Sequence, residues 1–288
     1  MIRLFVSDID GTLLNEKHVL SKGNEDAIYS LKEAGIEFML ASGRHYEGTL
    51  LPIKHMNLAL RCISLNGGDV RDYDGTNIFT QRISDSSVNK VYEIAQNLDT
   101  TMEYYCEDFA YTQVPFDVIE EVYIENFAKM FYMDLKEAEI LVKAHDIKNT
   151  MTYEASFGEI KKHHPLKMEF HFKDLKEKQK ALKQLNILDD IQLASSAPLN
   201  LEVTHKEASK GRLLKLYCER FGYKKEEVVV IGDSENDISM LSSFPNSYAM
   251  DNAENKIKKV AKNIAPSNAQ DGVAQIINKI INENRKKT

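Results

Sequence analysis

The 288-residue sequence has only three cysteines, and their positions exclude the frameworks that cysteines usually build. Cys62, Cys106 and Cys218 are odd in number, widely separated and without a CxxC pair. A disulfide framework needs paired cysteines and a structural zinc site needs closely spaced ligands, so neither is indicated. We interpret all three as reduced residues that pack in the interior.

Long hydrophobic runs and an excess of positive charge are also missing. No stretch approaches the run of about 18 apolar residues that predicts a membrane-spanning helix, and the segment MIRLFVSDID is too short and too acidic for a signal peptide. We therefore expect a cytoplasmic protein with no membrane partner. The net charge is −7, with no basic stripe, which argues against nucleic acid as the main partner.

Low-complexity tracts are absent too, and a composition of 43% hydrophobic and 28% charged residues is typical of an ordinary globular protein. The chain is long enough to bury a sizeable core. Its length favours two domains, or one large domain that carries an insertion.

Both ends of the chain alternate strand and helix patterns, which predicts a doubly wound, mostly parallel α/β sheet. An apolar run over residues 2–6 predicts a strand, and residues 21–35 have helical spacing with Ser21 as the N-cap. The next predicted strands are IEFMLASG and LRCISLNGG. The alternation resumes with a helix in KGRLLKLYCERFG, a strand in EEVVVIGDS, a helix in ENDISMLSSF, a strand in SYAMD and a helix in DGVAQIINKIINEN.

The middle of the chain has a different character. The segments TMEYYCED and LKMEFHFKD alternate apolar and polar residues, as strands with one solvated face do, and they are interleaved with amphipathic helices such as KDLKEKQKALKQLN. The simplest assembly is an α/β core of residues 1–83 and 205–288, interrupted by an α+β insert of residues 84–204. The DYDGTN segment predicts a β-hairpin just before the insert.

Polar residues follow four predicted strands at the point where each strand ends. They are Asp8 and Asp10, Ser42-Gly43-Arg44, Asn66-Gly67-Gly68, and the GDSEND segment of residues 232–237. Ligands of open parallel sheets collect beyond the carboxyl ends of the strands. With Lys210 at the predicted start of a helix, the cluster holds four acids, one hydroxyl, one amide and one lysine. This composition indicates a cation site that also accepts an anion.

Oxygen ligands without paired His or Cys favour Mg²⁺, which is usually held by one or two carboxylates together with phosphate and water. Asp8 and Asp233 are the natural pair. A phosphate monoester meets repulsion of roughly 4 kcal/mol per pair of unit charges at about 4 Å from a carboxylate, so the metal and Lys210 are needed to offset it. This arrangement suits an aspartate that attacks phosphorus and forms an aspartyl-phosphate.

Simpler interpretations exist for several of these residues. Aspartate is common in turns, so Asp8 and Asp10 can be interpreted as turn residues without a function. Asp233 and Asp237 are suited to cap the following helix, because an acid is stabilised at a helix N-terminus. Arg44 either pairs with an acid or meets a substrate anion, and the sequence does not choose between the two. The co-location of four strand-end motifs favours the functional interpretation over turns and caps.

The stretches DIDGTLL, ASGR, SKG and GDSEND, in this order and with a large insert between the second and the third, resemble the haloacid dehalogenase-like phosphatase superfamily. The position of the insert and the ending AMDNAENKIKKVA followed by DGVAQII resemble its Cof-type, sugar-phosphatase-like branch. The resemblance covers nearly the whole chain, although the insert matches only in position and general pattern. It implies that the insert is a cap domain that selects substrates.

The resemblance also implies a role for each acid. Asp8 matches the nucleophile and a metal ligand, whereas Asp10 matches the acid that protonates the leaving alcohol and gives Mg²⁺ its backbone carbonyl. Asp233 completes the metal shell, with Asp237 behind it as an orienting acid. Lys210 matches a catalytic, phosphate-binding position.

Further residues are expected at the substrate. The residues expected to contact the phosphate or its surroundings are Ser42, Gly43, Asn66 and Asn236. Two departures from the family pattern stand out. Ser42 occupies a position where Thr is common, which keeps the hydroxyl, and Asp251 occupies a position where the family usually has Gly, which puts the backbone geometry of that loop in doubt.

The sequence therefore predicts a Mg²⁺-dependent phosphatase that acts on small phosphorylated metabolites through an aspartyl-phosphate. Two other functions use the same chemistry. A phosphotransferase such as a mutase has the same nucleophile and a different acceptor, and a receiver-like switch also accepts phosphate on an aspartate. The acid at Asp10 and the large insert favour hydrolysis over a switch. The sequence gives neither the substrate nor the oligomeric state.

Overall fold

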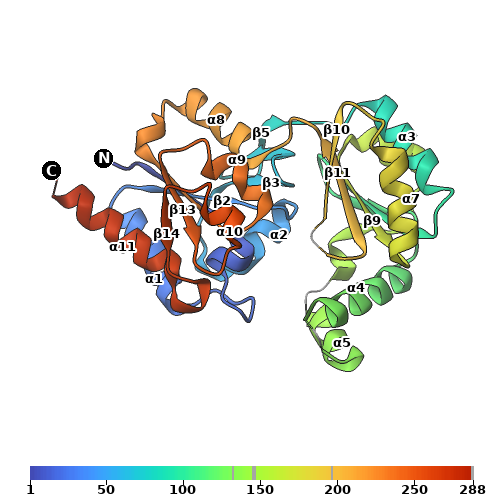
Figure 1. Cartoon of the computed structure of the whole chain (residues 1–288), viewed down its shortest axis with the longest axis horizontal. Helices are drawn as coiled ribbons and strands as arrows, with labels where there is room; N and C mark the ends of the chain where they lie inside the picture. Colours follow the sequence, from blue (N-terminus) through green and yellow to red (C-terminus); the bar gives the residue numbers. More distant parts are fainter. Residues whose placement is uncertain (132, 145–146, 196, 287–288) are drawn as a thin grey trace. The chain divides into compact units, whose positions relative to one another are not determined.

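The computed structural model describes residues 1–131, 133–144, 147–195 and 197–286. The chain divides into two compact units, a core unit of Met1–Phe79 with Ala208–Thr288 and an insert unit of Thr80–Glu207 (Figure 1). These limits lie three or four residues outside the expected insert of residues 84–204. The segment before residue 84 belongs with the insert because Ile83 is buried in the hydrophobic cluster of that unit.

The core unit contains an eight-stranded sheet in the order β14-β13-β12-β1-β2-β3-β4-β5. The six strands from β14 to β3 are parallel, and β4 is antiparallel to β3. The strands are β1 (Leu4–Ser7), β2 (Glu37–Ala41), β3 (Arg61–Ser64), β4 (Asp69–Arg71), β5 (Asn77–Thr80), β12 (Val228–Gly232), β13 (Asn246–Met250) and β14 (Asn263–Ala265). The predicted doubly wound, mostly parallel sheet is thereby confirmed.

Helices cover both faces of this sheet (Figure 1). Helices α1 (Lys22–Glu33) and α11 (Gly272–Arg285) pack together on one face, and α8 (Lys210–Phe221), α9 (Ile238–Leu241) and α10 (Asn255–Lys258) pack on the other. The short helix α2 (Tyr46–Leu50) follows β2. Helix α1 begins as predicted, because the Ser21 hydroxyl accepts a hydrogen bond from the backbone N–H of Asn24.

The helix predicted in ENDISMLSSF is shorter than its sequence pattern suggests. A 3₁₀ turn, η6 (Glu235–Asp237), leads into the four residues of α9. Pro245 disfavours a helical conformation at Phe244, so the helix ends before that residue. Phe244 is nevertheless buried against the core.

The insert unit contains a six-stranded sheet in the order β10-β11-β9-β6-β7-β8. Helices α3 (Asp85–Ala95) and α7 (Leu175–Leu185) pack on one face of this sheet, over Tyr104, Met168 and Val203 (Figure 1). The strands are β6 (Thr100–Cys106), β7 (Ala110–Thr112), β8 (Met151–Thr152), β9 (Pro165–Phe172), β10 (Ile191–Ala194) and β11 (Asn200–His205). The helices are α3 (Asp85–Ala95), α4 (Phe116–Phe131), α5 (Leu135–Ala144), α6 (Phe157–Ile160) and α7 (Leu175–Leu185). The predicted α+β insert is confirmed.

The second face of this sheet is buried, so the expectation of a solvated face is wrong. Glu103, Glu169 and Glu202 lie directly opposite one another on three neighbouring strands, and at most 9% of each is exposed. Lys167 Nζ lies 2.9 Å from Glu169 Oε2 and 3.4 Å from Glu202 Oε1. Tyr123 of α4 donates to Glu103 at 3.0 Å. These partners offset the cost of removing the carboxylates from water, and an alternating sequence pattern does not distinguish such a face from a solvated one.

Two expectations from composition are also addressed by the structure. The three cysteines are buried, and none of them forms a disulfide. Across the described parts of the chain, no helix combines the length and the apolar character needed to cross a bilayer.

Candidate active site

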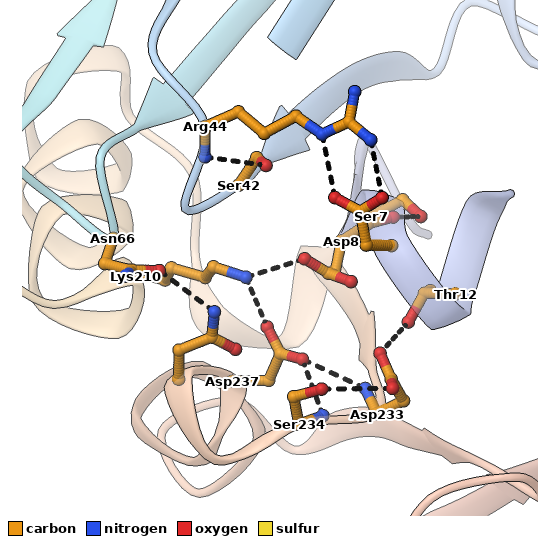
Figure 2. Close-up of polar contacts among 12 residues, drawn as sticks. Ser7, Asp8, Thr12, Ser42, Arg44, Asn66, Lys210, Asp233, Ser234 and Asp237 are labelled. Atoms are coloured by element: carbon orange, nitrogen blue, oxygen red, sulfur yellow. Dashed lines mark hydrogen bonds and ion pairs between the residues drawn. The ribbon is translucent and has the colours of Figure 1, made fainter. Parts of the chain in front are cut away.

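Three sequence-predicted site residues lie at the carboxyl ends of adjacent parallel strands (Figure 2). Asp8 directly follows β1, Ser42 follows β2 and Asp233 follows β12. Because β12, β1 and β2 are neighbours in the sheet and run in one direction, their ends meet at the same edge. The fold thus brings together residues that are more than 200 positions apart in the sequence.

Lys210 forms ion pairs with two of the acids, Asp8 and Asp237. Lys210 Nζ donates to Asp8 Oδ1 at 2.7 Å and to Asp237 Oδ1 at 2.7 Å, and all three side chains are buried. Its position is set by Ser209, whose hydroxyl accepts from the backbone N–H of Arg212 and starts α8. Burial lowers the pKa of the Lys210 ammonium, but Asp237 and Asp8 outweigh it and raise that pKa above its ordinary value. Lys210 therefore stays charged.

Asp8, Asp233 and Asp237 form the metal-binding candidate, since one carboxylate oxygen of each lies within 4.8 Å of the others. Burial is the main cause that raises the pKa of Asp8 well above its ordinary range, and Asp237 raises it further while Lys210 opposes it. Burial and Asp237 raise the pKa of Asp233 to about 6. Three carboxylates share one lysine here, so this oxygen-rich, anionic donor set fits a magnesium ion.

Asp237 uses both of its carboxylate oxygens within the protein. Oδ1 accepts from Lys210, and Oδ2 accepts from the backbone N–H groups of Asp233 and Ser234 at 2.9 and 3.0 Å. These bonds fold the loop after β12 into the η6 turn and direct Asp233 toward Asp8. The contacts fit an acid that orients the metal ligands from behind.

The loop after β1 comes close to Asp233. A single π-helical turn, η1 (Ile9–Leu13), contains Gly11 with a φ of +78°, and a Cβ at this position would lie 2.4 Å from Asp233 Oδ2. Glycine is thus required by both backbone conformation and space. Thr12 Oγ1 donates to Asp233 Oδ1 at 2.8 Å. Thr12 was missed as a site residue, although it lies within the DIDGTLL motif.

The loop that contains Asn252 forms a hydrogen bond to the η1 turn. Asn252 Nδ2 donates to the backbone carbonyl of Gly11 at 2.8 Å, and its Oδ1 accepts from the backbone N–H of Asn268 at 3.0 Å. The neighbouring Asp251 does not have a positive φ. The doubt about this loop is thereby removed, because its backbone does not need the freedom of a glycine at that position.

The expected phosphate-binding side chains lie around the loops after β2 and β3. Ser42 is buried, and its Oγ accepts from the backbone N–H of Arg44 at 3.1 Å. Asn236 Nδ2 donates to Asn66 Oδ1 at 2.9 Å. A Cβ at Gly43 would lie 2.9 Å from Asn66 Oδ1, so the backbone of Gly43 closely approaches this amide pair.

Gly67 has a structural reason for being glycine. Its φ is +96°, and a Cβ there would lie 2.4 to 2.5 Å from backbone atoms of Ser209. The loop after β3 therefore presses directly on the start of α8. This packing places Asn66 beside the helix that carries Lys210.

Arg44, whose role the sequence left open, pairs with Asp10. Nε donates to Asp10 Oδ2 at 2.8 Å and Nη2 donates to Oδ1 at 2.6 Å. His18 Nδ1 lies 3.6 Å from Asp10 Oδ1. Partial burial raises the pKa of Asp10, but His18 and Arg44 outweigh it and hold that pKa well below its ordinary value. His18 was missed because it comes from a turn without any periodic signal.

Comparisons with known proteins identify the family of this chain. The family model of the haloacid dehalogenase-like hydrolases matches residues 5–277. The chain is 29% identical over 291 residues to phosphatase YwpJ of Bacillus subtilis, covering 97% of this chain and all of that protein. It is 24% identical over 280 residues to the 5-amino-6-(5-phospho-D-ribitylamino)uracil phosphatase YcsE of Bacillus subtilis, covering 96% and 94% of the two chains.

Solved structures extend the similarity to the fold. A haloacid dehalogenase-like hydrolase from B. subtilis superposes with a TM-score of 0.82 at 25% identity, over 96% of this chain and 99% of that one. The subclass IIB sugar phosphatase BT4131 superposes with a TM-score of 0.75 at 21% identity, over 96% and 98% of the two chains, and this likeness concerns the fold alone. The family predicted from the four motifs is thus confirmed: the chain belongs to the haloacid dehalogenase-like hydrolases and is an enzyme of the phosphatase type.

Proposed function

We propose that this enzyme is a Mg²⁺-dependent phosphatase that hydrolyses small phosphorylated metabolites, sugar phosphates or similar, through an aspartyl-phosphate on Asp8. The observation that carries the proposal is the position of Asp8. Its carboxylate lies at the centre of the strand-end cluster, 2.7 Å from Lys210 and beside Asp233. The amino-terminal strand of the sheet thus presents a nucleophile to a site that suits both a cation and a phosphate.

In the first half of the reaction, an Asp8 oxygen attacks phosphorus and the bond to the ester oxygen breaks. The departing alkoxide takes a proton from Asp10, and general acid catalysis of this kind typically contributes about 10²–10⁴-fold. In the second half, water attacks phosphorus, Asp10 takes the proton of the water and the bond to Asp8 breaks. The products are an alcohol, inorganic phosphate and the regenerated enzyme.

The remaining residues hold the reacting groups in place. Asp8, Asp233 and the backbone carbonyl of Asp10 would hold Mg²⁺, which when bound supplies positive charge to the phosphoryl oxygens. Lys210 balances the charge of Asp8 and keeps it oriented. Ser42 and Asn236, with Gly43 and Asn66 beside them, are suited to bind the phosphoryl oxygens.

The insert unit selects the substrate in this proposal, because all residues assigned to the chemistry belong to the core unit. Two similar proteins, YcsE and YwtE of Bacillus subtilis, are named for a substrate with a phosphorylated ribityl chain. These names support a small phosphorylated metabolite as the substrate class. We expect a cytoplasmic enzyme without a nucleic-acid or membrane partner.

The test is a screen of the purified protein over a panel of phosphorylated metabolites, with Mg²⁺ and with excess chelator. Release of inorganic phosphate that requires Mg²⁺ supports a phosphatase. A phosphotransferase would instead convert one sugar phosphate into another without releasing phosphate. Full turnover in excess chelator would contradict the metal requirement.

A further inference from the structure

Arg44 holds the side chain of Asp10 through both carboxylate oxygens, at 2.8 and 2.6 Å. A guanidinium presents its N–H groups in a rigid planar fork. Two parallel hydrogen bonds from this fork therefore fix the plane and the direction of the carboxylate as well as its distance. The third nitrogen, Nη1, donates to the backbone carbonyl of Gly48 at 3.2 Å.

Arg44 is itself fixed by the loops that form the site. Its backbone N–H donates to Ser42 Oγ at 3.1 Å, and its carbonyl accepts from the backbone N–H of Leu65 at 2.9 Å. Ser42 is the hydroxyl proposed to bind the phosphoryl group. The same short loop thus determines where the phosphoryl group and the Asp10 carboxylate lie relative to each other.

Asp10 depends on this support because its side chain is 43% exposed and comes from an irregular turn. His18 lies farther away, at 3.6 Å, and is equally exposed. A general base must lie within hydrogen-bond reach of the proton it takes. A misplacement of about 1 Å is enough to cost about 10²-fold in rate.

We propose that Arg44 is a positioning residue for the second half of the reaction, in which Asp10 takes a proton from the water that hydrolyses phosphorylated Asp8. This inference rests on the proposed function. Asp10 Oδ2 accepts one N–H of Arg44 and keeps a lone pair for the water, whereas Oδ1 also faces His18. As the water O–H bond breaks, its oxygen bonds to phosphorus, the Asp8–phosphorus bond breaks and the proton passes to Asp10. With a leaving group that needs little protonation, such as p-nitrophenolate, this half-reaction is the one that depends on where the Asp10 carboxylate lies.

The experiment measures the two half-reactions separately by rapid quench with p-nitrophenyl phosphate and Mg²⁺. The variants are Arg44→Gln and Arg44→Lys, the second of which keeps the charge and loses the fork. Arg3→Lys, at the amino end of β1 and paired with Glu227, is the matched control. Mass spectrometry of the acid-quenched protein detects phosphorylated Asp8. A second ester, glucose 6-phosphate, is assayed in the steady state.

We expect kcat of Arg44→Gln to fall about 10- to 100-fold on p-nitrophenyl phosphate. The burst of nitrophenol should keep a rate within about threefold of wild type, and phosphorylated enzyme should accumulate, because only its hydrolysis is slowed. Arg44→Lys should also accumulate phosphorylated enzyme, to a smaller extent. Arg3→Lys should behave as wild type. If Arg44→Gln fails to fold, Arg44→Lys alone decides.

Several results would overturn the inference while wild type remains active. They are a lower kcat without phosphorylated enzyme, a higher KM with unchanged kcat, or a wild-type rate in Arg44→Lys. The second of these results would place Arg44 in direct contact with the substrate. Wild-type enzyme that released phosphate from neither ester would instead overturn the proposed function.

Discussion

The ammonium of Lys210 donates a 2.7 Å hydrogen bond to the carboxylate of Asp8, 202 positions away in the sequence. Both side chains are buried, and the same ammonium also bonds Asp237. Asp8, the proposed nucleophile, is thus joined to helix α8 by a buried ion pair. Because two buried carboxylates are paired with this one ammonium, its removal should lower the stability of the core unit.

Lys210→Met should destabilise the core unit by about 3–5 kcal/mol, because it leaves buried carboxylates without their cation. It should also abolish turnover. Added Mg²⁺ should restore more of the melting temperature in this variant than it adds to wild type, since a bound dication offsets the same repulsion. Thermal melts by circular dichroism, with and without MgCl₂, measure both effects.

The control for this substitution is Lys32→Met on the exposed side of α1. It should change the melting temperature little in either condition. Equal melting temperatures for Lys210→Met and wild type without Mg²⁺ would contradict the importance of the buried pair.

Alanine substitutions at two glycines with similar backbone conformations should distinguish the effect of backbone strain from the effect of a steric clash. Gly11 has a φ of +78° and Gly35 a φ of +68°, but only at Gly11 would a Cβ meet another residue, Asp233. Each alanine variant should lose about 1–2 kcal/mol of stability, because a Cβ is disfavoured in the left-handed conformation. Gly11→Ala alone should also raise the Mg²⁺ concentration needed for half-maximal activity, because Asp233 must move. A parallel rise in Gly35→Ala would show that strain, and not displacement of Asp233, is responsible.

The insert unit should lose stability in acid through Glu169. Burial raises the pKa of this carboxyl, but Lys167 and His171 outweigh it and lower the pKa to about 2. A folded-state pKa below that of the unfolded chain means that stability is present above about pH 4.5 and is lost as the pH falls toward 2. The stability advantage of wild type over Glu169→Gln should therefore shrink between pH 5 and pH 2.

Hydrogen exchange of the β9 amides, followed by mass spectrometry, reports on the insert unit alone. The exposed Glu93→Gln on α3 is the control and should show no such pH dependence. A gap between wild type and Glu169→Gln that stays constant with pH would contradict the assigned ion pair.

The parts of the site that were predictable from sequence follow buried strands. An apolar run fixes where β1 ends, so the placement of Asp8 at the sheet edge follows from the run and the DIDG motif together. The same holds for Ser42 after β2 and Asp233 after β12. Parallel strands bring their ends to one edge, so the convergence of these residues needs no knowledge of side-chain contacts.

The unpredicted parts depend on contacts between loops. The partner of Arg44 remained open because its choice of Asp10 depends on how two loops fold, and neither loop has a periodic pattern. Asn252 joins η1 to a loop about 240 positions later, which no local signal reveals. The buried polar face of the insert was misjudged for a related reason, since its burial depends on Lys167 and on Tyr123 of α4 rather than on the alternation of the strands.

The two acids of the DIDG motif should be separable by substitution. Asp8→Asn should abolish turnover and prevent any phosphorylated enzyme, because an amide is a poor nucleophile and carries no charge for the metal. Asp10→Asn keeps the backbone carbonyl and should keep metal binding while it loses proton transfer, an effect typically worth about 10²–10⁴-fold. In single-turnover reactions, phosphorylation of Asp8 should slow most with glucose 6-phosphate, whose alkoxide needs a proton to depart. It should slow least with p-nitrophenyl phosphate, whose leaving group needs little protonation. An equal loss on the two esters would reject the proton-donor role, and a phosphoryl adduct that persists in Asp8→Asn would move the nucleophile to another residue.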